Sequence, residues 1–242
     1  MISDWVYFGA VHTLDAFLWG GELLGEENLP DQGPAVFVAN HLGPLGPIGC
    51  VCSIPLRMYF WSIGDMMDKE LAPDYLRVDF VEPRLRLKMP FSLKFSRALS
   101  RLTVPLLRSL GCIPVYRGDY MRMNETLKAS LEWLLEEKFL LVFPENAEMG
   151  EDTMTHIRPF QKTVFRLGEM YYEQRHKRLE FYPVAIHESR KVMVGKPYLY
   201  NPLNVVAQER LRLKDLAEAS VRRMYAEMEK GDLTGLLAPE RQ

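Results

Sequence analysis

The sequence predicts an α/β fold, in which a mostly parallel central sheet is covered by helices on both faces. Two short apolar runs, at residues 35–39 and 139–143, are too short for helices and are typical of strands buried on both faces. Segments with helical spacing of apolar residues alternate with such runs, which indicates crossover connections between parallel strands. Neither an internal repeat nor a low-complexity tract interrupts this alternation, so residues 25–242 are expected to form one domain.

The individual elements follow in order from the N-terminus. The first residues place apolar side chains on one face of a helix, which predicts an amphipathic helix within residues 1–24. This face carries Tyr7, Val11, Leu14 and Leu18. Further strands are expected at residues 57–61, 112–115, 181–186 and 192–194, and helices at residues 91–110, 121–137, 160–174 and 211–230. Residues 69–94 mix charges with prolines, so no element is assigned there before the helix predicted from residue 91.

The composition excludes several classes of protein. A formal net charge of −2 argues against a nucleic-acid-binding protein, which usually carries a strongly basic surface. The 3 cysteines cannot form a fully paired disulfide framework, and Cys50 and Cys52 lack the second pair that a zinc site needs, so no metal is expected. The N-terminus lacks the features of a secretory signal, and prolines interrupt the apolar stretch at residues 42–64. A cytoplasmic protein without a spanning helix is expected.

Polar residues follow three of the predicted strands. Asn40 and His41 come directly after the strand at residues 35–39. Because open parallel sheets bind ligands at the carboxyl ends of their strands, His41 is a candidate general base there. Arg117 and Glu145 follow two other strands, and a guanidinium suits phosphate or carboxylate ligands. The structural alternatives are a capping or core role for His41 and an ion pair between Arg117 and Glu145.

In this order and spacing, these segments resemble the sequence blocks of the glycerol-3-phosphate and lysophosphatidate acyltransferase family. Residues 27–41 match the lead-in and the Asn-His pair of the first block, and residues 111–117 match the second block, a glycine, an aliphatic stretch and an arginine. Phe143-Pro144-Glu145 matches the third block, and Pro183-Val184 matches the weaker fourth block. The resemblance spans residues 25–200 and implies an acyltransferase-like α/β domain.

The resemblance also implies a site and its substrates. His41 would be the catalytic base, deprotonating a hydroxyl of a glycerolipid, a lysolipid or another alcohol. The acceptor-binding residues that it implies are Arg117, Glu145, Asn40, Gly118 and Pro144. Acyl-CoA or an acyl carrier protein would be the co-substrate, with no bound cofactor and no metal.

The chain departs from the family pattern at a functional position. Gly46 stands where the family has the aspartate that orients the histidine, and Asn146-Ala147-Glu148 replaces the family's Gly-Thr-Arg. Two hypotheses therefore stay open: an acyltransferase, or a catalytically weak or inactive protein of this fold that binds lipid or acyl thioester. A third keeps catalysis with a substitute carboxylate. The candidates for that carboxylate are Asp65, Asp68 and Glu145.

Two segments predict peripheral attachment to the inner face of a membrane. The N-terminal helix offers aromatic residues of the type that settle among lipid headgroups, namely Trp5, Phe8, Phe17 and Trp19. Basic residues cluster between Arg84 and Arg101, interleaved with large apolar ones, a mixture that suits anionic headgroups. The alternative is that the helix packs on the core and the basic cluster is a solvated face.

Overall fold

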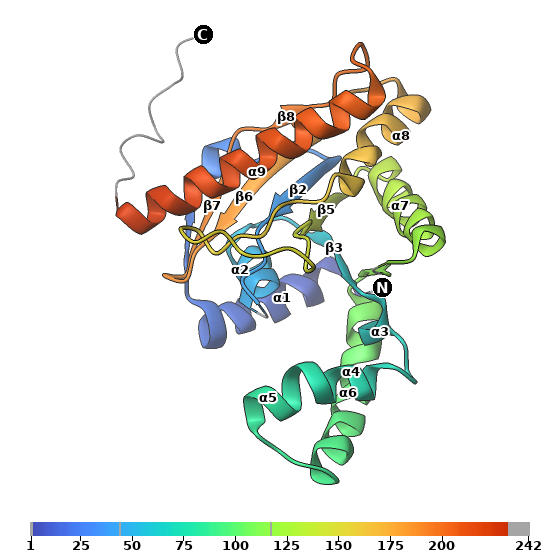
Figure 1. Ribbon diagram of the computed structural model, residues 1–242, viewed down its shortest axis with the longest axis vertical. Helices are drawn as coiled ribbons and strands as arrows, with labels where there is room; N and C mark the ends of the chain where they lie inside the picture. Colours follow the sequence, from blue (N-terminus) through green and yellow to red (C-terminus); the bar gives the residue numbers. More distant parts are fainter. Residues whose placement is uncertain (1, 44, 117, 232–242) are drawn as a thin grey trace. The chain divides into compact units, whose positions relative to one another are not determined.

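The computed structural model describes residues 2–43, 45–116 and 118–231. Contacts divide the chain into two compact units, each described here by itself (Figure 1). The first unit comprises Met1–Tyr7 and Tyr59–Ser130, and the second comprises Phe8–Met58 and Leu131–Gln242. Helices α1 (Asp4–Leu14) and α7 (Tyr120–Leu135) contribute residues to both. The assignment of residues 25–242 to one domain stays a prediction.

The second unit is built on a sheet whose strands run in the order β1-β7-β6-β2-β5, with β8 paired to β6. The strands are β1 (Glu22–Leu24), β2 (Ala35–Ala39), β5 (Phe139–Val142), β6 (Glu180–Ile186), β7 (Lys191–Val194) and β8 (Tyr198–Leu199). Strand β2 is fully buried and runs parallel to both of its neighbours, β5 and β6. Strands β7 and β8 run antiparallel to β6, so the sheet is mostly parallel with an antiparallel edge.

Helices cover both faces of this sheet. The helices of the unit beyond α1 and α7 are η1 (Asp15–Trp19), η2 (Glu26–Asn28), α2 (Leu45–Ser53), η4 (Thr163–Phe165), α8 (Arg166–Arg175) and α9 (Val206–Lys230). Pro183 of β6 and Met224 of α9 both border Gly195, whereas Ile186 of β6 borders Gly46 of α2. Because Pro183 and Ile186 are three residues apart in one strand, α9 and α2 lie on opposite faces. The predicted fold class is confirmed.

The first unit contains a parallel strand pair and a group of helices. Strand β3 (Met58–Ile63) pairs with β4 (Ile113–Val115). The helices are α3 (Gly64–Met67), α4 (Ala72–Leu76), η3 (Arg77–Val81), α5 (Glu82–Leu85) and α6 (Phe91–Ser109). Helix α6 packs against α3, α4 and η3 and contains Pro105 within its length.

Most predicted elements are present, and the largest shift of a boundary has a clear cause. The helix predicted at residues 160–174 begins only at Arg166, after the short η4. Phe160 instead forms an antiparallel bridge with Glu145, and the Gln161 N–H donates to the Pro144 carbonyl. The chain here is therefore held extended against the end of β5.

The N-terminal helix differs from its predicted form. Helix α1 passes directly into η1, which ends at Trp19, and Trp19 is buried, with its indole N–H donating to Ser53 Oγ at 2.8 Å. Trp19 therefore belongs to the core of the second unit, while Trp5 and Phe17 are exposed. Among the residues that the structure describes, no helix combines the length and the apolar character needed to cross a bilayer.

Candidate functional site

Strand register brings His41 and Glu145 together. Val38 of β2 is paired with Val142 of the parallel neighbour β5, so the third residue beyond each of them lies at the same level of the sheet. Those residues are His41 and Glu145, and the His41 backbone N–H donates to Glu145 Oε1 at 2.5 Å. These two predicted site residues therefore meet at the carboxyl edge of the sheet.

The Glu145 carboxylate acts as a brace between two segments of backbone. Its second oxygen, Oε2, accepts from the backbone N–H of Arg158 at 3.1 Å. Burial raises the pKa of Glu145 above its ordinary value, while the two N–H donors oppose that rise by favouring the ionised form. Both hydrogen bonds come from backbone N–H groups, so the carboxylate holds the backbone of His41 in place.

Asn40 ties the neighbouring strand to the same place. Its side chain is buried, donates through Nδ2 to the Ile186 carbonyl at 3.0 Å, and accepts from the Ile186 N–H at 2.7 Å through Oδ1. A carboxamide can satisfy both backbone groups at once because it carries a donor and an acceptor. Asn40, the residue before His41, therefore links the end of β2 to the end of β6.

His41 itself is exposed at this edge. Its ring lies edge-to-face against Phe143, with ring centroids 5.4 Å apart and an interplanar angle of 83°. Phe143 is the first residue after β5, so the aromatic contact and the Glu145 brace come from the same segment. An exposed imidazole whose backbone is held in this way is suited to accept a proton from a bound hydroxyl group.

Gly46 lies beside His41 in the first turn of α2. A Cβ added at Gly46 would lie 3.7 Å from the carbonyl carbon of His41, 3.7 Å from Ile186 Cδ1 and 3.8 Å from the Asn40 carbonyl oxygen. These are ordinary van der Waals distances, so the buried position accepts a Cβ without displacing backbone. Gly46, the position at which the chain departs from the pattern that it resembles, thus lies next to the backbone of His41.

The other predicted residues fall in different places. Arg117 lies outside the described residues, and with it the predicted ion pair to Glu145. Gly118 belongs to the first unit and has a φ of 75°, a left-handed conformation that favours glycine. Pro144 is buried after β5. Asp65 and Asp68 belong to the first unit, where Asp68 Oδ1 accepts from the backbone N–H groups of Glu70 and Leu71.

A loop at residues 147–158, here named the strap, follows the Glu145 segment and returns to it. The Asn146 N–H donates to the Pro159 carbonyl at 2.9 Å, which closes the base of the strap. Within it, Asp152 accepts from the backbone N–H groups of Met154 and Thr155 and from the Thr155 hydroxyl. These bonds hold the pKa of Asp152 down at about 2, with the Thr155 hydroxyl as the largest cause.

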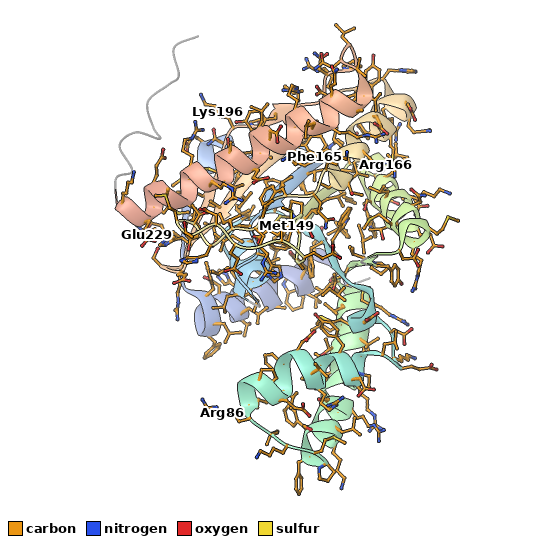
Figure 2. The ribbon with its side chains drawn as sticks, in the orientation of Figure 1. Arg86, Met149, Phe165, Arg166, Lys196 and Glu229 are labelled. Atoms are coloured by element: carbon orange, nitrogen blue, oxygen red, sulfur yellow. The ribbon has the colours of Figure 1, made fainter. Side chains whose placement is uncertain are left out.

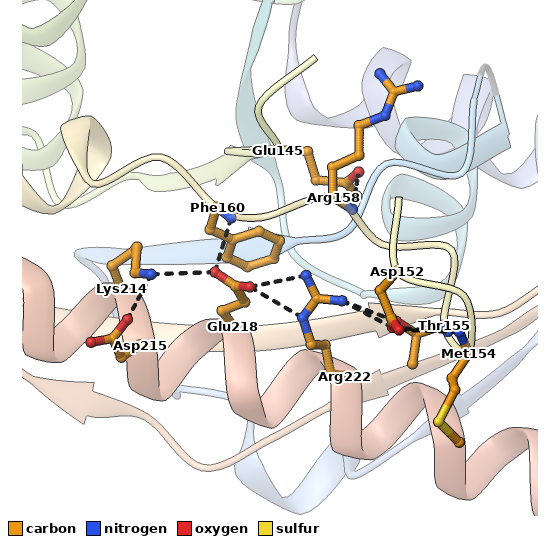
Figure 3. Close-up of polar contacts among 10 residues, drawn as sticks. All are labelled: Glu145, Asp152, Met154, Thr155, Arg158, Phe160, Lys214, Asp215, Glu218 and Arg222. Carbon is orange, nitrogen blue, oxygen red and sulfur yellow. Dashed lines mark hydrogen bonds and ion pairs between the residues drawn. The ribbon is translucent and has the colours of Figure 1, made fainter. Parts of the chain in front are cut away.

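Helix α9 anchors the strap through ionic contacts (Figure 3). Arg222 donates to Asp152 at 3.1 Å and to Glu218 at 2.9 Å. Glu218 in turn accepts from the Phe160 N–H at 2.9 Å. One helix face therefore holds both the strap and the segment that is bridged to Glu145. Nothing in the sequence pattern of α9 distinguished Glu218 and Arg222 from ordinary surface charges.

A second polar cluster joins the β6–β7 hairpin to α9. His187 Nε2 lies 2.5 Å from Glu229 Oε2, and His187 Nδ1 lies 2.7 Å from Ser189 Oγ (Glu229 is labelled in Figure 2). The His187 ring also packs on Tyr225, with centroids 4.7 Å apart. The Ser189 N–H donates to the same Nδ1, so the cluster closes the hairpin turn. Within the described ranges, no group of three or more His, Cys, Asp or Glu side chains is placed to hold a metal ion.

Comparisons with known proteins bear on the fold. No family model and no curated protein matches the chain by sequence. Among the solved structures that match is the 1-acyl-sn-glycerophosphate (LPA) acyltransferase PlsC from Thermotoga maritima, at 15% identity and a TM-score of 0.56. The match covers 95% of this chain and 84% of that one. The chain therefore has the fold of that acyltransferase, as the resemblance of its sequence blocks implied.

Proposed function

We propose that this protein is an O-acyltransferase that moves a fatty acyl chain from acyl-CoA or an acyl carrier protein to a hydroxyl of a glycerolipid or another alcohol. The observation that carries the proposal is the exposed imidazole of His41, whose backbone is braced by Glu145 at the carboxyl edge of the sheet. This edge is where parallel α/β sheets carry their catalytic groups.

The proposed reaction has two steps. The His41 imidazole takes the proton of the acceptor hydroxyl as the oxygen attacks the thioester carbonyl, and a C–O bond forms. The tetrahedral intermediate then collapses, the C–S bond breaks, and the imidazolium returns its proton to the departing thiolate. The products are an ester and a free thiol, and neither an acyl-enzyme nor a metal takes part.

The acceptor is proposed to bind beside His41. Arg117 and Gly118 are the proposed contacts for the acceptor, since the resemblance gives the second block this role. The backbone contacts of Asn40, Pro144 and Glu145 support a positioning role for these three residues. Glu148 replaces a family arginine where a phosphate would be met, which favours an acceptor without a phosphate group because like charges repel.

A second candidate function is a binding module that has the fold and binds lipid or acyl thioester without turning it over. Gly46 favours it, because a glycine stands where the family pattern has an aspartate. In the serine-protease triad, the aspartate orients the histidine, and its replacement by asparagine lowers kcat by about 10⁴. The two candidates differ in one measurable respect: only the enzyme releases a thiol.

Thiol release from acyl-CoA in the presence of a panel of alcohols and lysolipids tests the proposal. The wild-type protein should release thiol in an acceptor-dependent manner, and His41→Ala should abolish the release. His12→Ala is the matched control, since His12 is an exposed histidine on α1, and it should leave the rate unchanged. Saturable acyl-CoA binding with no thiol release for any acceptor would establish the binding module instead.

The proposed setting is the cytoplasmic side of a membrane, at its inner face. The acyl chain and a lipid acceptor are both poorly soluble in water, so an enzyme that joins them gains from working at the bilayer surface. The exposed Trp5 and Phe17 of the N-terminal segment support this setting, whereas the buried Trp19 does not contribute to it.

A further inference from the structure

Helix α6 of the first unit buries a polar side and exposes an apolar one. Its buried residues are Ser92, Ser96, Ser100 and Val104, spaced by four and therefore in one row. This row packs towards α3, α4 and η3, and Ser92 Oγ donates to Glu82 at 2.9 Å. The helix thus reverses the arrangement of an ordinary surface helix, whose apolar stripe faces the core.

The exposed side of α6 carries large apolar side chains. These are Phe91 at 68% exposed, Phe95 at 43%, Leu102 at 73% and Leu106 at 55%. At 3.6 residues per turn, the four positions fall within about 60° around the helix axis, so they form one continuous stripe. Such a stripe is costly to leave in water, and contiguous exposed apolar surface marks an interaction site.

Basic residues lie along one flank of this stripe. Lys94, Arg97 and Arg101 are exposed, and their positions on the helix adjoin those of Phe91 and Leu102. Residues 86–110 contain no Asp or Glu, although the whole chain has a net charge of −2. This segment therefore has a net positive charge where the apolar stripe is exposed.

The segment that leads into α6 also exposes basic and apolar side chains. An open cavity of about 540 Å³ is lined by Glu82, Arg86, Leu87, Lys88 and Met89 (Arg86 is labelled in Figure 2). Arg86 and Lys88 are exposed, and Met89 is 57% exposed. Arginine and lysine are the side chains that bind phosphate groups in proteins. The side chain of Arg84, predicted to belong to this cluster, lies outside the described part of the chain.

We propose that α6 and residues 85–91 form a docking surface for a bilayer that contains anionic phospholipid, with the apolar stripe entering the headgroup region and the basic flank contacting phosphates. Charge complementarity selects this occupant, because the exposed Lys and Arg of α6 beside its Phe and Leu side chains match anionic headgroups over acyl chains. The proposal does not depend on acyl transfer, since it concerns binding by the first unit only.

Flotation of the full chain with liposomes tests the surface. Vesicles of phosphatidylcholine with about a third phosphatidylglycerol should float the protein, vesicles of phosphatidylcholine should float it weakly, and added salt should weaken binding, since salt screens surface charges. Neutralising three near-surface charges, in Lys94→Gln/Arg97→Gln/Arg101→Gln, should weaken partitioning by on the order of a hundredfold. The matched control is Lys128→Gln/Lys177→Gln/Lys230→Gln, which changes the net charge equally at exposed positions elsewhere and should bind as the wild type does.

A second pair of variants separates bilayer docking from simple binding of anions. Phe91→Ala/Leu102→Ala removes the most exposed part of the stripe and should weaken flotation at least tenfold, while Met121→Ala/Leu203→Ala, at other exposed apolar positions, should not. Circular dichroism of every variant checks that the fold is kept. The proposal is overturned if both basic triple variants float alike, if the two alanine pairs float alike, or if soluble inorganic phosphate displaces the protein at low millimolar concentration.

Discussion

The backbone N–H of His41 donates to the carboxylate of Glu145 at 2.5 Å, although 104 residues separate the two in the chain. The contact exists because β2 and β5 are parallel neighbours in a register that places Val38 beside Val142. The carboxylate also accepts from Arg158, so one side chain joins two strand ends and the base of the strap. Four experiments follow from this arrangement and its surroundings.

Glu145→Gln should lower the free energy of unfolding of the second unit by about 1–3 kcal/mol. The amide has one acceptor oxygen for two backbone donors, so either the His41 or the Arg158 N–H loses its partner. Urea unfolding followed by far-ultraviolet circular dichroism measures the change. Glu136→Gln, at an exposed glutamate just after α7, is the control and should unfold as the wild type does. A loss no larger than that of the control contradicts the bracing role.

Gly46→Asp should raise acceptor-dependent thiol release. The Cβ fits at ordinary contact distance from the backbone carbonyl of His41, and the expected gain requires that the new carboxylate reach the imidazole. The expected gain is at least about tenfold, with an upper bound of about 10⁴, the effect of the orienting aspartate in the serine-protease triad. Gly150→Asp, at an open glycine with no neighbour within 4 Å, controls for the added charge. An unchanged rate in Gly46→Asp, with His41→Ala equally unchanged, favours the binding module.

Asn40→Ala should destabilise the second unit by about 2–5 kcal/mol, because it leaves the N–H and the carbonyl of Ile186 without their side-chain partner. Both groups lie between buried strands where water does not replace the lost bonds. Thermal unfolding and urea unfolding measure the effect, with Gln174→Ala at an exposed position of α8 as the control. A change below about 0.5 kcal/mol would falsify the structural role of Asn40, since surface substitutions fall in that range.

The anchoring of the strap should weaken in acid. The pKa of Asp152 is about 2 in the folded protein against an ordinary value of 3.8, so its stabilising effect is fully present above 3.8 and is lost as the pH falls through about 2. Hydrogen exchange of the Met154 and Thr155 amides, corrected for intrinsic rates, measures the anchoring because both amides donate to Asp152. Asp152→Asn should expose them at neutral pH.

The difference in amide protection between wild type and Asp152→Asn should stay constant above about pH 5, shrink as the pH falls below about 4, and disappear only as the pH falls through about 2. Asp79→Asn, at an exposed aspartate of the first unit, should leave the protection of the strap unchanged throughout. A constant difference down to pH 2 means that another group holds the strap.

Patterns with a strong local cause could be predicted from the sequence. The run Ala35–Ala39 has no polar residue and forms β2 with every residue buried. Helix α6 forms as predicted despite Pro105, because that proline lies in its last turns and the Leu110 N–H still reaches the Leu106 carbonyl. The convergence of His41 and Glu145 was also within reach, since each residue follows a buried strand.

What the sequence did not reveal depends on pairing between distant segments. No local pattern shows that β5 is the neighbour of β2. The hydrogen bond from the His41 N–H to Glu145 depends on the register of these two strands, so it could not be predicted from the sequence. The sequence from Phe160 onward has helical spacing. The backbone of Phe160 nevertheless forms a bridge with Glu145, and its N–H donates to the Glu218 side chain of α9. Residues 69–94 form α4, η3 and α5, which are too short to show an apolar period.

The dependence of the strap on α9 has a consequence for the order of assembly during synthesis. Ribosomes release chains from the N-terminus, so β2, β5 and Glu145 emerge well before Glu218 and Arg222. The contact between His41 and Glu145 can therefore form on the nascent chain while the loop at residues 147–158 still lacks its ionic anchor. A nascent protein halted before residue 218 would have the strand ends joined and the strap open to proteases.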